Sequence, residues 1–271
     1  MGNQSPLGII AGNGAYPFLV AAAARQSGVP EIHVAAFENE TRPELASRVD
    51  SIEWMRVGQL GRLLKYFGKL GIRQAMMAGQ IAPQNLFDLR PDLRVLVLLS
   101  KLKRRNAETL FGALGDELAK IGVELLPATT FLEDSLAFDG LIGGPKPKRR
   151  FLEDIAYGFE IAKQVSKLDI GQTVIVRNGT VLAVEAFEGT NEAIRRGAAL
   201  GKQGAVVVKV SKPNQDMRFD VPVIGCETLE IASAAGVAVI AVEAGRTLLL
   251  EKDAVIALAE EKHITIYGYK L

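Results

Sequence analysis

An apolar run that leads directly into a glycine-rich turn opens the chain and limits the folds it can adopt. Leu7–Ala11 is followed by Gly12, Asn13 and Gly14, and Pro17 then suits the first turn of a helix, where its missing N–H does no harm. A helix N-terminus offers free N–H groups and the positive end of the helix dipole. The sequence therefore predicts a strand-to-helix turn that faces a phosphate-bearing ligand. A tight turn without a ligand is the simpler alternative.

The remainder of the first half repeats this alternation of strand and helix. Strands are expected at 31–37, 51–56, 73–78 and 123–126, and helices at 59–70 and 107–121. Strands that alternate with helices predict a mostly parallel sheet covered on both faces, which is an α/β, Rossmann-like arrangement. The dinucleotide fingerprint needs a third glycine where this chain has Pro17, so a nicotinamide cofactor is the weaker alternative, with Glu38 as its ribose-binding acid.

The second half has a different pattern, which predicts a C-terminal mixed α/β domain. Asn178-Gly179 between two apolar runs is typical of a type I′ hairpin, and further helices and strands follow to the end of the chain. Residues 135–150 are rich in glycine and proline and end in a basic run from Lys146 to Arg150, which is typical of a solvated linker. We therefore expect a domain at 1–134, a linker at 135–150 and a catalytic domain at 151–271.

Composition excludes several classes of protein. The 271 residues carry a formal net charge of +1, so no broad positive field favours nucleic acid. The single cysteine, Cys226, excludes an internal disulfide and suits a reducing compartment, and the absence of a leader pattern predicts a cytoplasmic protein. Two histidines make a histidine-rich zinc site improbable, so a bound metal would use carboxylates, which favours Mg²⁺ or Mn²⁺.

A second glycine loop, Gly79-Gln80, also follows an expected strand. Ligands of doubly wound sheets collect at the carboxyl ends of the strands, so this loop and Gly12 to Gly14 are predicted to border one binding site. Simple termination of a strand is the alternative interpretation.

Acids and cations of the second half form another candidate site. Glu185 lies between Val184 and Ala186 on a strand that reads as buried, and a buried carboxylate needs a partner. That partner is either a metal ion or a salt bridge to Arg195 or Arg196. Glu188 follows the strand, and Thr190 or Asn191 is expected to cap the next helix.

The stretch 209–225 concentrates charged side chains in a loop. Asp216 and Asp220 are predicted to share a divalent cation, while Lys212 and Arg218 hold phosphate oxygens, an arrangement that suits metal-assisted phosphoryl transfer. A solvated turn is the alternative. Glu243-Ala244-Gly245-Arg246 adds another acid and cation, and alone it reads as a hairpin corner.

At these residues the chain resembles the LpxI-type UDP-2,3-diacylglucosamine pyrophosphatases. The resemblance runs nearly end to end through six segments: Gly8 to Pro17; Met77 to Ile81; Leu168 to Gln172; Val184 to Asn191 with Ile194, Arg195 and Arg196; Lys212 to Pro222; and Glu243 to Gly245. Members often have aspartate where this chain has Asn191 and a third glycine where it has Asn13. Many have valine followed by arginine where it has Ile81, Ala82 and Pro83, so the contacts in question are chiefly those of a charge at positions 191 and 82.

The resemblance implies hydrolysis of UDP-2,3-diacylglucosamine to UMP and 2,3-diacylglucosamine 1-phosphate (lipid X), a divalent-cation-dependent step of lipid A synthesis at the inner face of the inner membrane. It places the key acid on Asp220. From the residues themselves we expect Asp216 as a second catalytic candidate, and Asp220, Asp216 and Glu185 as metal ligands. The acylated sugar nucleotide is the expected partner, with transient membrane contact and a homodimer as further expectations. The predicted substrate-binding residues are Gly12, Asn13, Gly14, Gly79, Gln80, Glu188, Thr190, Asn191, Arg195, Lys212 and Arg218.

The runner-up function is a non-catalytic nucleotide or sugar-nucleotide binding module, in which Asp220 belongs to a structural ion pair. Metal binding that depends on Asp220 distinguishes this module from the enzyme. The basic runs Lys101 to Arg105 and Lys146 to Arg150 are the expected contacts with anionic lipid heads.

Overall fold

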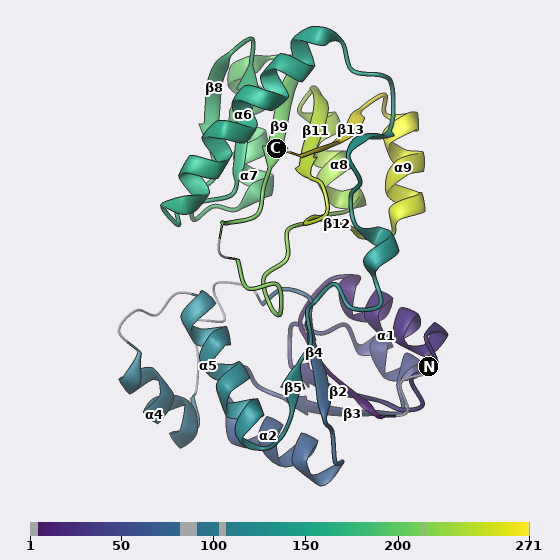
Figure 1. The fold of residues 1–271 in the computed structure, drawn as a ribbon, viewed down its shortest axis with the longest axis vertical. Helices are drawn as coiled ribbons and strands as arrows, with labels where there is room; N and C mark the ends of the chain where they lie inside the picture. The colour runs from purple at the N-terminus through teal and green to yellow at the C-terminus, as the bar shows by residue number, and fades with distance from the viewer. Residues whose placement is uncertain (1–4, 82–90, 103–106, 214, 271) are drawn as a thin grey trace. The chain divides into compact units, whose positions relative to one another are not determined.

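The chain divides into two units in a computed structural model that describes residues 5–81, 91–102, 107–213 and 215–270 (Figure 1). The first unit contains Met1–Leu132 together with Asp216–Asp220, and the second contains Glu133–Gln215 and Val221–Leu271. The sequence placed Asp216 and Asp220 in the C-terminal domain, whereas by their contacts they group with the first unit. Their segment comes from the second half of the sequence but makes its contacts within the first unit.

Parallel strands form the sheet of the first unit. They are β1 (Leu7–Ala11), β2 (Ile32–Phe37), β3 (Ser51–Met55), β4 (Gln74–Ala78) and β5 (Glu124–Leu125), in the order β3-β2-β1-β4-β5. Every residue of β1 and β2 is buried, as expected for parallel strands with both faces covered. The predicted Rossmann-like, mostly parallel sheet is confirmed. The strand order reverses between β1 and β4, the position at which such sheets bind ligands.

Helices α1 (Tyr16–Gln26), α2 (Leu60–Lys69), α4 (Leu93–Lys101) and α5 (Ala107–Lys120) belong to this unit, with a 3₁₀ turn η1 (Pro43–Arg48). The apolar residues of α2 recur at helical spacing, so Leu60, Leu63, Leu64 and Phe67 face one core. That core also holds Leu118 of α5. The predicted helix at 59–70 is thus confirmed within a residue at each end.

A mixed sheet forms the centre of the second unit, with the order β6-β13-β11-β9-β7-β8. Its strands are β6 (Gly140–Gly143), β7 (Thr173–Arg177), β8 (Thr180–Val184), β9 (Ala205–Lys209), β11 (Val237–Glu243) and β13 (Thr265–Tyr269). Strands β9, β11 and β13 are parallel, whereas β7 runs antiparallel to β8 and β9, and β6 antiparallel to β13. The expected mixed α/β domain is confirmed.

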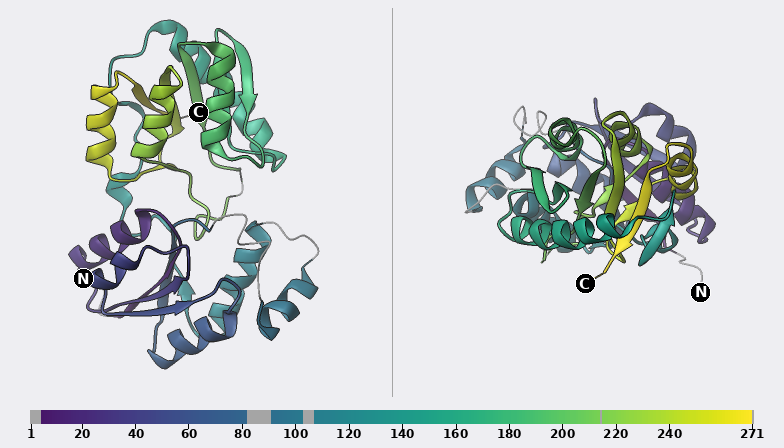
Figure 2. Two further views of the ribbon diagram at one scale, coloured as in Figure 1. Left: turned by 180° about the vertical axis from the view of Figure 1, so that it is seen from behind. Right: turned by 90° about the horizontal axis from the view of Figure 1, so that it is seen from above.

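Helices cover both faces of this second sheet. Figure 2 shows α6 (Arg149–Lys167) on one face and α7 (Thr190–Gly201), α8 (Cys226–Ala234) and α9 (Lys252–Glu261) on the other. Alternate residues of each strand serve the two cores, so Val174 packs on the α6 side and Ile175 on the α7 side. A short parallel pair, β10 (Val223–Ile224) and β12 (Leu248–Leu249), lies beside the main sheet, and η2 (Glu133–Ser135) starts the unit.

Two sequence interpretations have different outcomes in this unit. Asn178 and Gly179 both have positive φ, of 48° and 70°, and join antiparallel β7 and β8, so the predicted type I′ hairpin is confirmed. The stretch 135–150, interpreted as a linker, contains β6 and the first residues of α6. Its glycines are explained by packing, because a Cβ on Gly143 or Gly144 would press on Ile256 or Ile264.

The two glycine loops of the first unit contact each other directly. Asn13 and Gln80 form a β-bridge in which the N–H of Asn13 donates to the carbonyl of Gln80 at 2.7 Å and the N–H of Gln80 donates to that of Asn13 at 3.2 Å. A Cβ on Gly12 would meet the backbone of Gln80 within 3.0 Å, and one on Gly79 would meet that of Asn13. Close approach of two backbones, rather than a ligand, therefore accounts for these two glycines.

We predict that Gly12→Ala lowers the free energy of unfolding by about 1–3 kcal/mol, the usual cost of overpacking, because its Cβ would displace the Gln80 backbone. Denaturant unfolding measures the change. Gly68→Ala is the matched control, since Gly68 lies in α2 with open space around its Cβ position, and we expect it to be neutral or stabilising. Equal stability of the two variants would contradict the loop-to-loop explanation.

Candidate active site

The segment Asp216–Asp220 lies against the end of β5 in the first unit. The N–H of Ala128, just beyond β5, donates to the carbonyl of Met217 at 2.7 Å. The carbonyl of Ala128 accepts a hydrogen bond from the hydroxyl of Tyr16, the first residue of α1. Burial raises the pKa of the Tyr16 hydroxyl, which keeps it a proton donor at neutral pH. Ala128 thus links the helix after the first glycine turn to the segment that carries Asp220.

Aromatic packing also fastens this segment. The rings of Phe219 and Phe111, the latter in α5, have centroids 5.7 Å apart and planes tilted by 43°. Phe219 packs against the core that contains Leu118 and Leu125. A large aromatic contact of this kind stabilises a segment that has no strand or helix of its own.

Arg218 and Asp216 form a forked ion pair within the segment. Nε of Arg218 lies 2.9 and 3.1 Å from the two carboxylate oxygens, and Nη2 lies 2.6 Å from Oδ2. The hydrogen bond from Arg218 holds the pKa of Asp216 below its usual range, against partial burial, which raises it. Asp216 is therefore an ionised carboxylate whose acceptors are already engaged by Arg218.

Asp220 follows a tight turn at the end of the segment. Its N–H donates to the carbonyl of Asp216 at 3.1 Å, as does that of Phe219 at 3.3 Å. The side chain is half-buried. The turn brings Asp216, Arg218 and Asp220 into one short loop, as the sequence predicted, and this loop groups with the first unit rather than with the C-terminal domain.

A buried polar chain lies at the carboxyl ends of β8 and β9 in the second sheet. Lys209, at the end of β9, donates to Oγ1 of Thr190 at 3.2 Å, and Thr190 Oγ1 donates to Oε1 of Glu185 at 2.9 Å. Lys209 and Glu185 are each 8% exposed. Within the described residues, Oε2 of Glu185 is buried without a hydrogen-bond partner. Glu185 is thus paired through Thr190, and the expected salt bridge to Arg195 or Arg196 is wrong.

Those two arginines bind other acids. Arg196 pairs with Glu188 and holds its pKa low through that hydrogen bond, and Arg195 pairs with Glu192 one turn earlier on α7. Helix α7 has Gly189 as its N-cap with no side-chain cap, so the capping role expected of Thr190 or Asn191 is also wrong. Asn191 instead donates to Glu227 at 3.2 Å.

The predicted site residues are therefore divided between the two units. The first unit holds Gly12, Asn13, Gly14, Gly79, Gln80, Asp216, Arg218 and Asp220, whereas the second holds Glu185, Glu188, Thr190, Asn191, Arg195 and Lys212. Lys212, predicted to act beside Arg218, pairs with Asp169 in the second unit.

The metal-ligand set proposed from the sequence is not assembled within either unit, because Asp216 and Asp220 belong to the first and Glu185 to the second. Among the residues with a described placement, no three His, Cys, Asp or Glu side chains gather as a metal-binding group. Asp216 is moreover engaged by Arg218 through both oxygens. Neither unit by itself therefore presents a preformed cation site built from these three acids.

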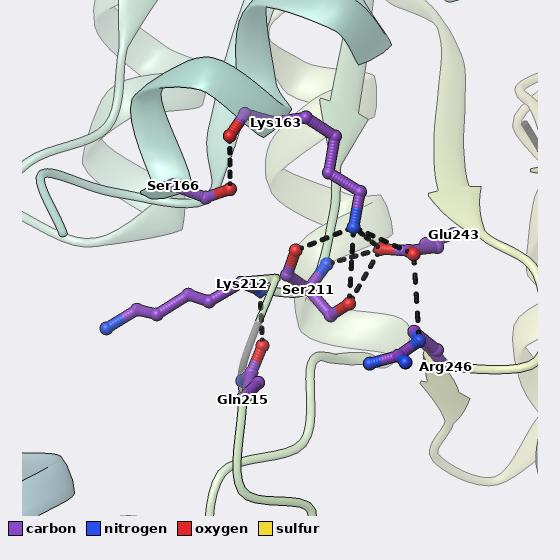
Figure 3. Close-up of polar contacts among 7 residues, drawn as sticks. All are labelled: Lys163, Ser166, Ser211, Lys212, Gln215, Glu243 and Arg246. Carbon is purple, nitrogen blue, oxygen red and sulfur yellow. Dashed lines mark hydrogen bonds and ion pairs between the residues drawn. The ribbon is translucent and has the colours of Figure 1, made fainter. Parts of the chain in front are cut away.

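The pairing of Glu243 with Lys163 and Ser211 was missed from the sequence (Figure 3). Glu243 ends β11 and receives Lys163 Nζ at 2.8 and 2.7 Å, with Ser211 and Arg246 beside it. Strand β11 is flanked by parallel neighbours, so interpretation of this stretch as a hairpin corner is wrong. The available signal was an acid at the end of a buried apolar strand, which needs a cationic partner.

These features define a two-unit α/β protein with a Rossmann-like first unit and an acid-and-cation segment, contributed by the second half of the sequence, at the end of its last strand. Sequence models of the LpxI N-terminal domain and the LpxI C-terminal domain match residues 6–135 and 139–267. The chain belongs to the LpxI family. It is 32% identical to the UDP-2,3-diacylglucosamine pyrophosphatase LpxI of Caulobacter vibrioides over 273 aligned positions, which cover 97% of this chain and 96% of that protein.

Proposed function

We propose that this protein hydrolyses the pyrophosphate bond of UDP-2,3-diacylglucosamine and releases UMP and 2,3-diacylglucosamine 1-phosphate (lipid X) in lipid A synthesis. The pyrophosphatase named above is similar along almost the whole chain, which supports the same reaction here. Water adds to one phosphorus, the bridging P–O bond breaks, and each product keeps one phosphate.

The observation that carries the proposal is the placement of Asp216–Asp220 on the Rossmann-like unit. Ala128 binds both Met217 and Tyr16, so the segment lies close to the start of the helix that follows the glycine turn. We assign to Asp220 the orientation of the attacking water and to Arg218 the stabilisation of phosphate charge, with Asp216 as the residue that holds the guanidinium. Lys212 and Arg195 are the further cations proposed to contact phosphate.

The proposal predicts that purified protein releases UMP from UDP-2,3-diacylglucosamine and that Asp220→Ala lowers the rate by about 100-fold or more, the usual scale for loss of a proton-transfer group. Asp139→Asn is the control, since Asp139 is an exposed carboxylate of the second unit. Full activity of Asp220→Ala would contradict the role of Asp220, and absence of UMP release by the unmodified protein would contradict the reaction.

Dependence on Mg²⁺ or Mn²⁺ is a separate part of the proposal. A bound divalent cation lowers the pKa of water and stabilises phosphate charge. The same assay in EDTA should lose activity and regain it when Mg²⁺ or Mn²⁺ is added back. Unchanged release in EDTA would contradict the metal requirement. Metal-dependent ligand binding without any hydrolysis would instead favour the non-catalytic sugar-nucleotide module.

We also propose that the protein acts in the cytoplasm as a peripheral protein of the inner membrane, with α4 as the contact. No helix among the described residues is long and apolar enough to cross a bilayer. Leu93, Leu96 and Val97 of α4 are 76, 50 and 47% exposed, next to Arg94 and Lys101. Apolar side chains beside basic ones suit an anionic lipid surface. Of the basic run at 101–105, residues 103–105 lie outside the described residues.

Vesicle flotation tests this surface. Leu96→Glu should weaken binding to phosphatidylglycerol vesicles by about tenfold. The change replaces an apolar side chain that would contact lipid with a negative charge that the anionic lipid repels. Leu200→Glu is the matched control, since Leu200 is 66% exposed on α7. Equal binding of both variants would contradict the assignment. Sedimentation of the same preparations tests the predicted homodimer.

A further inference from the structure

Three polar groups of Ser211 form hydrogen bonds with one buried ion pair of the second unit. Its N–H and its hydroxyl both donate to Oε2 of Glu243, at 2.7 and 2.8 Å, and its carbonyl accepts from Nζ of Lys163 at 2.9 Å (Figure 3). Lys163 comes from α6 and Glu243 from the end of β11. We name Lys163, Glu243 and Ser211 the anchor.

The anchor is shielded from solvent. Ser211 is fully buried, and the side chains of Glu243 and Lys163 are 12 and 22% exposed. Loss of Glu243 leaves Lys163 without its counter-charge in a poorly hydrated place, whereas loss of Lys163 leaves Glu243 with Arg246 alone among the described cations, at 3.8 Å. Glu243 and Lys163 together determine the position of the Ser211 backbone.

Ser211 stands where the chain leaves the second unit. It follows β9, and the residues after Gln215 belong to the first unit until the chain returns at Val221. The returning end is also held: the N–H of Leu248 donates to the carbonyl of Pro222 at 2.9 Å, and Lys209 donates to that of Val223 at 3.0 Å. The chain is therefore held within the second unit both before and after the segment with Asp216, Arg218 and Asp220.

Hydrogen bonds between Lys212 and Gln215 follow Ser211 along the chain. The N–H of Lys212 donates to Oε1 of Gln215 at 2.7 Å, and the N–H of Gln215 donates to the carbonyl of Lys212 at 3.2 Å. Gln215 is 9% exposed, although it lies in a connecting segment. Lys212 and Gln215, which lie between the anchor and the catalytic segment, are thus bonded to each other.

We propose that Lys163 and Glu243 are positioning residues for Asp220, acting through Ser211. This inference rests on the proposed function for its catalytic consequence. The anchor holds the chain shortly before it leaves the second unit. A displacement of about 1 Å at a reacting group can cost about 100-fold in rate. Loss of the anchor should therefore lower kcat for UMP release while substrate binding is largely retained.

The experiment compares Lys163→Met and Glu243→Gln with Asp154→Asn. Asp154 is a matched control, because it is a buried carboxylate of the same unit on the same helix as Lys163, and it accepts from the N–H groups of Asn178 and Gly179 at 2.9 and 2.7 Å, at the β7–β8 hairpin. Ser211→Ala removes only the hydroxyl and is the milder variant if the others fold poorly. Hydrogen exchange of residues 211–220 and the kcat and KM for UMP release are measured on the folded full-length chain.

We expect exchange at 211–220 to rise about tenfold or more in both anchor variants and kcat to fall about 10- to 100-fold with KM within about threefold. Asp154→Asn should change neither. Exchange and kcat that stay at the unmodified level in the anchor variants, or that change equally in Asp154→Asn, would overturn the proposal. If the unmodified protein releases no UMP, the proposed function fails, while the exchange measurement still decides whether the anchor holds the segment.

Discussion

The backbone of Ala128 makes the pair of hydrogen bonds on which the candidate site depends. Its N–H binds the carbonyl of Met217, and its carbonyl receives the hydroxyl of Tyr16. One residue after β5 thereby joins a segment from the second half of the sequence to the first residue of α1. Each bond contributes about 1 kcal/mol, so the ring contact of Phe219 with Phe111 is needed as well to keep the segment in place.

Contacts between distant parts of the chain also change how the glycine turn is interpreted. In isolation, Gly12, Asn13 and Gly14 suggest a phosphate loop, because glycines allow a ligand to approach the backbone. In the fold, Asn13 forms a bridge with Gln80, and both Gly12 and Gly79 are required for that approach. The glycines therefore allow the loops that follow β1 and β4 to pack together. A ligand bound there would contact both loops.

Local patterns predicted much of the fold and less of the site. The alternation of strands and helices, the spacing in α2 and the Asn178-Gly179 turn each depend on neighbouring residues, and all three were predicted. The docking of Asp216–Asp220 was not, because it depends on contacts with Ala128 and Phe111, far away in the sequence. Lys163 and Glu243 are separated by 80 positions, so their pairing was equally invisible to a local pattern.

The central claim is that Asp216–Asp220 works as part of the first unit, and a double-mutant cycle on Phe111 and Phe219 tests it most directly. The unfolding free energies of Phe111→Leu, Phe219→Leu and the double variant are measured, together with UMP release. The account predicts a coupling energy of about 0.5–1.5 kcal/mol between the two rings and a lower rate in Phe219→Leu. Additive stabilities with an unchanged rate in Phe219→Leu would contradict it.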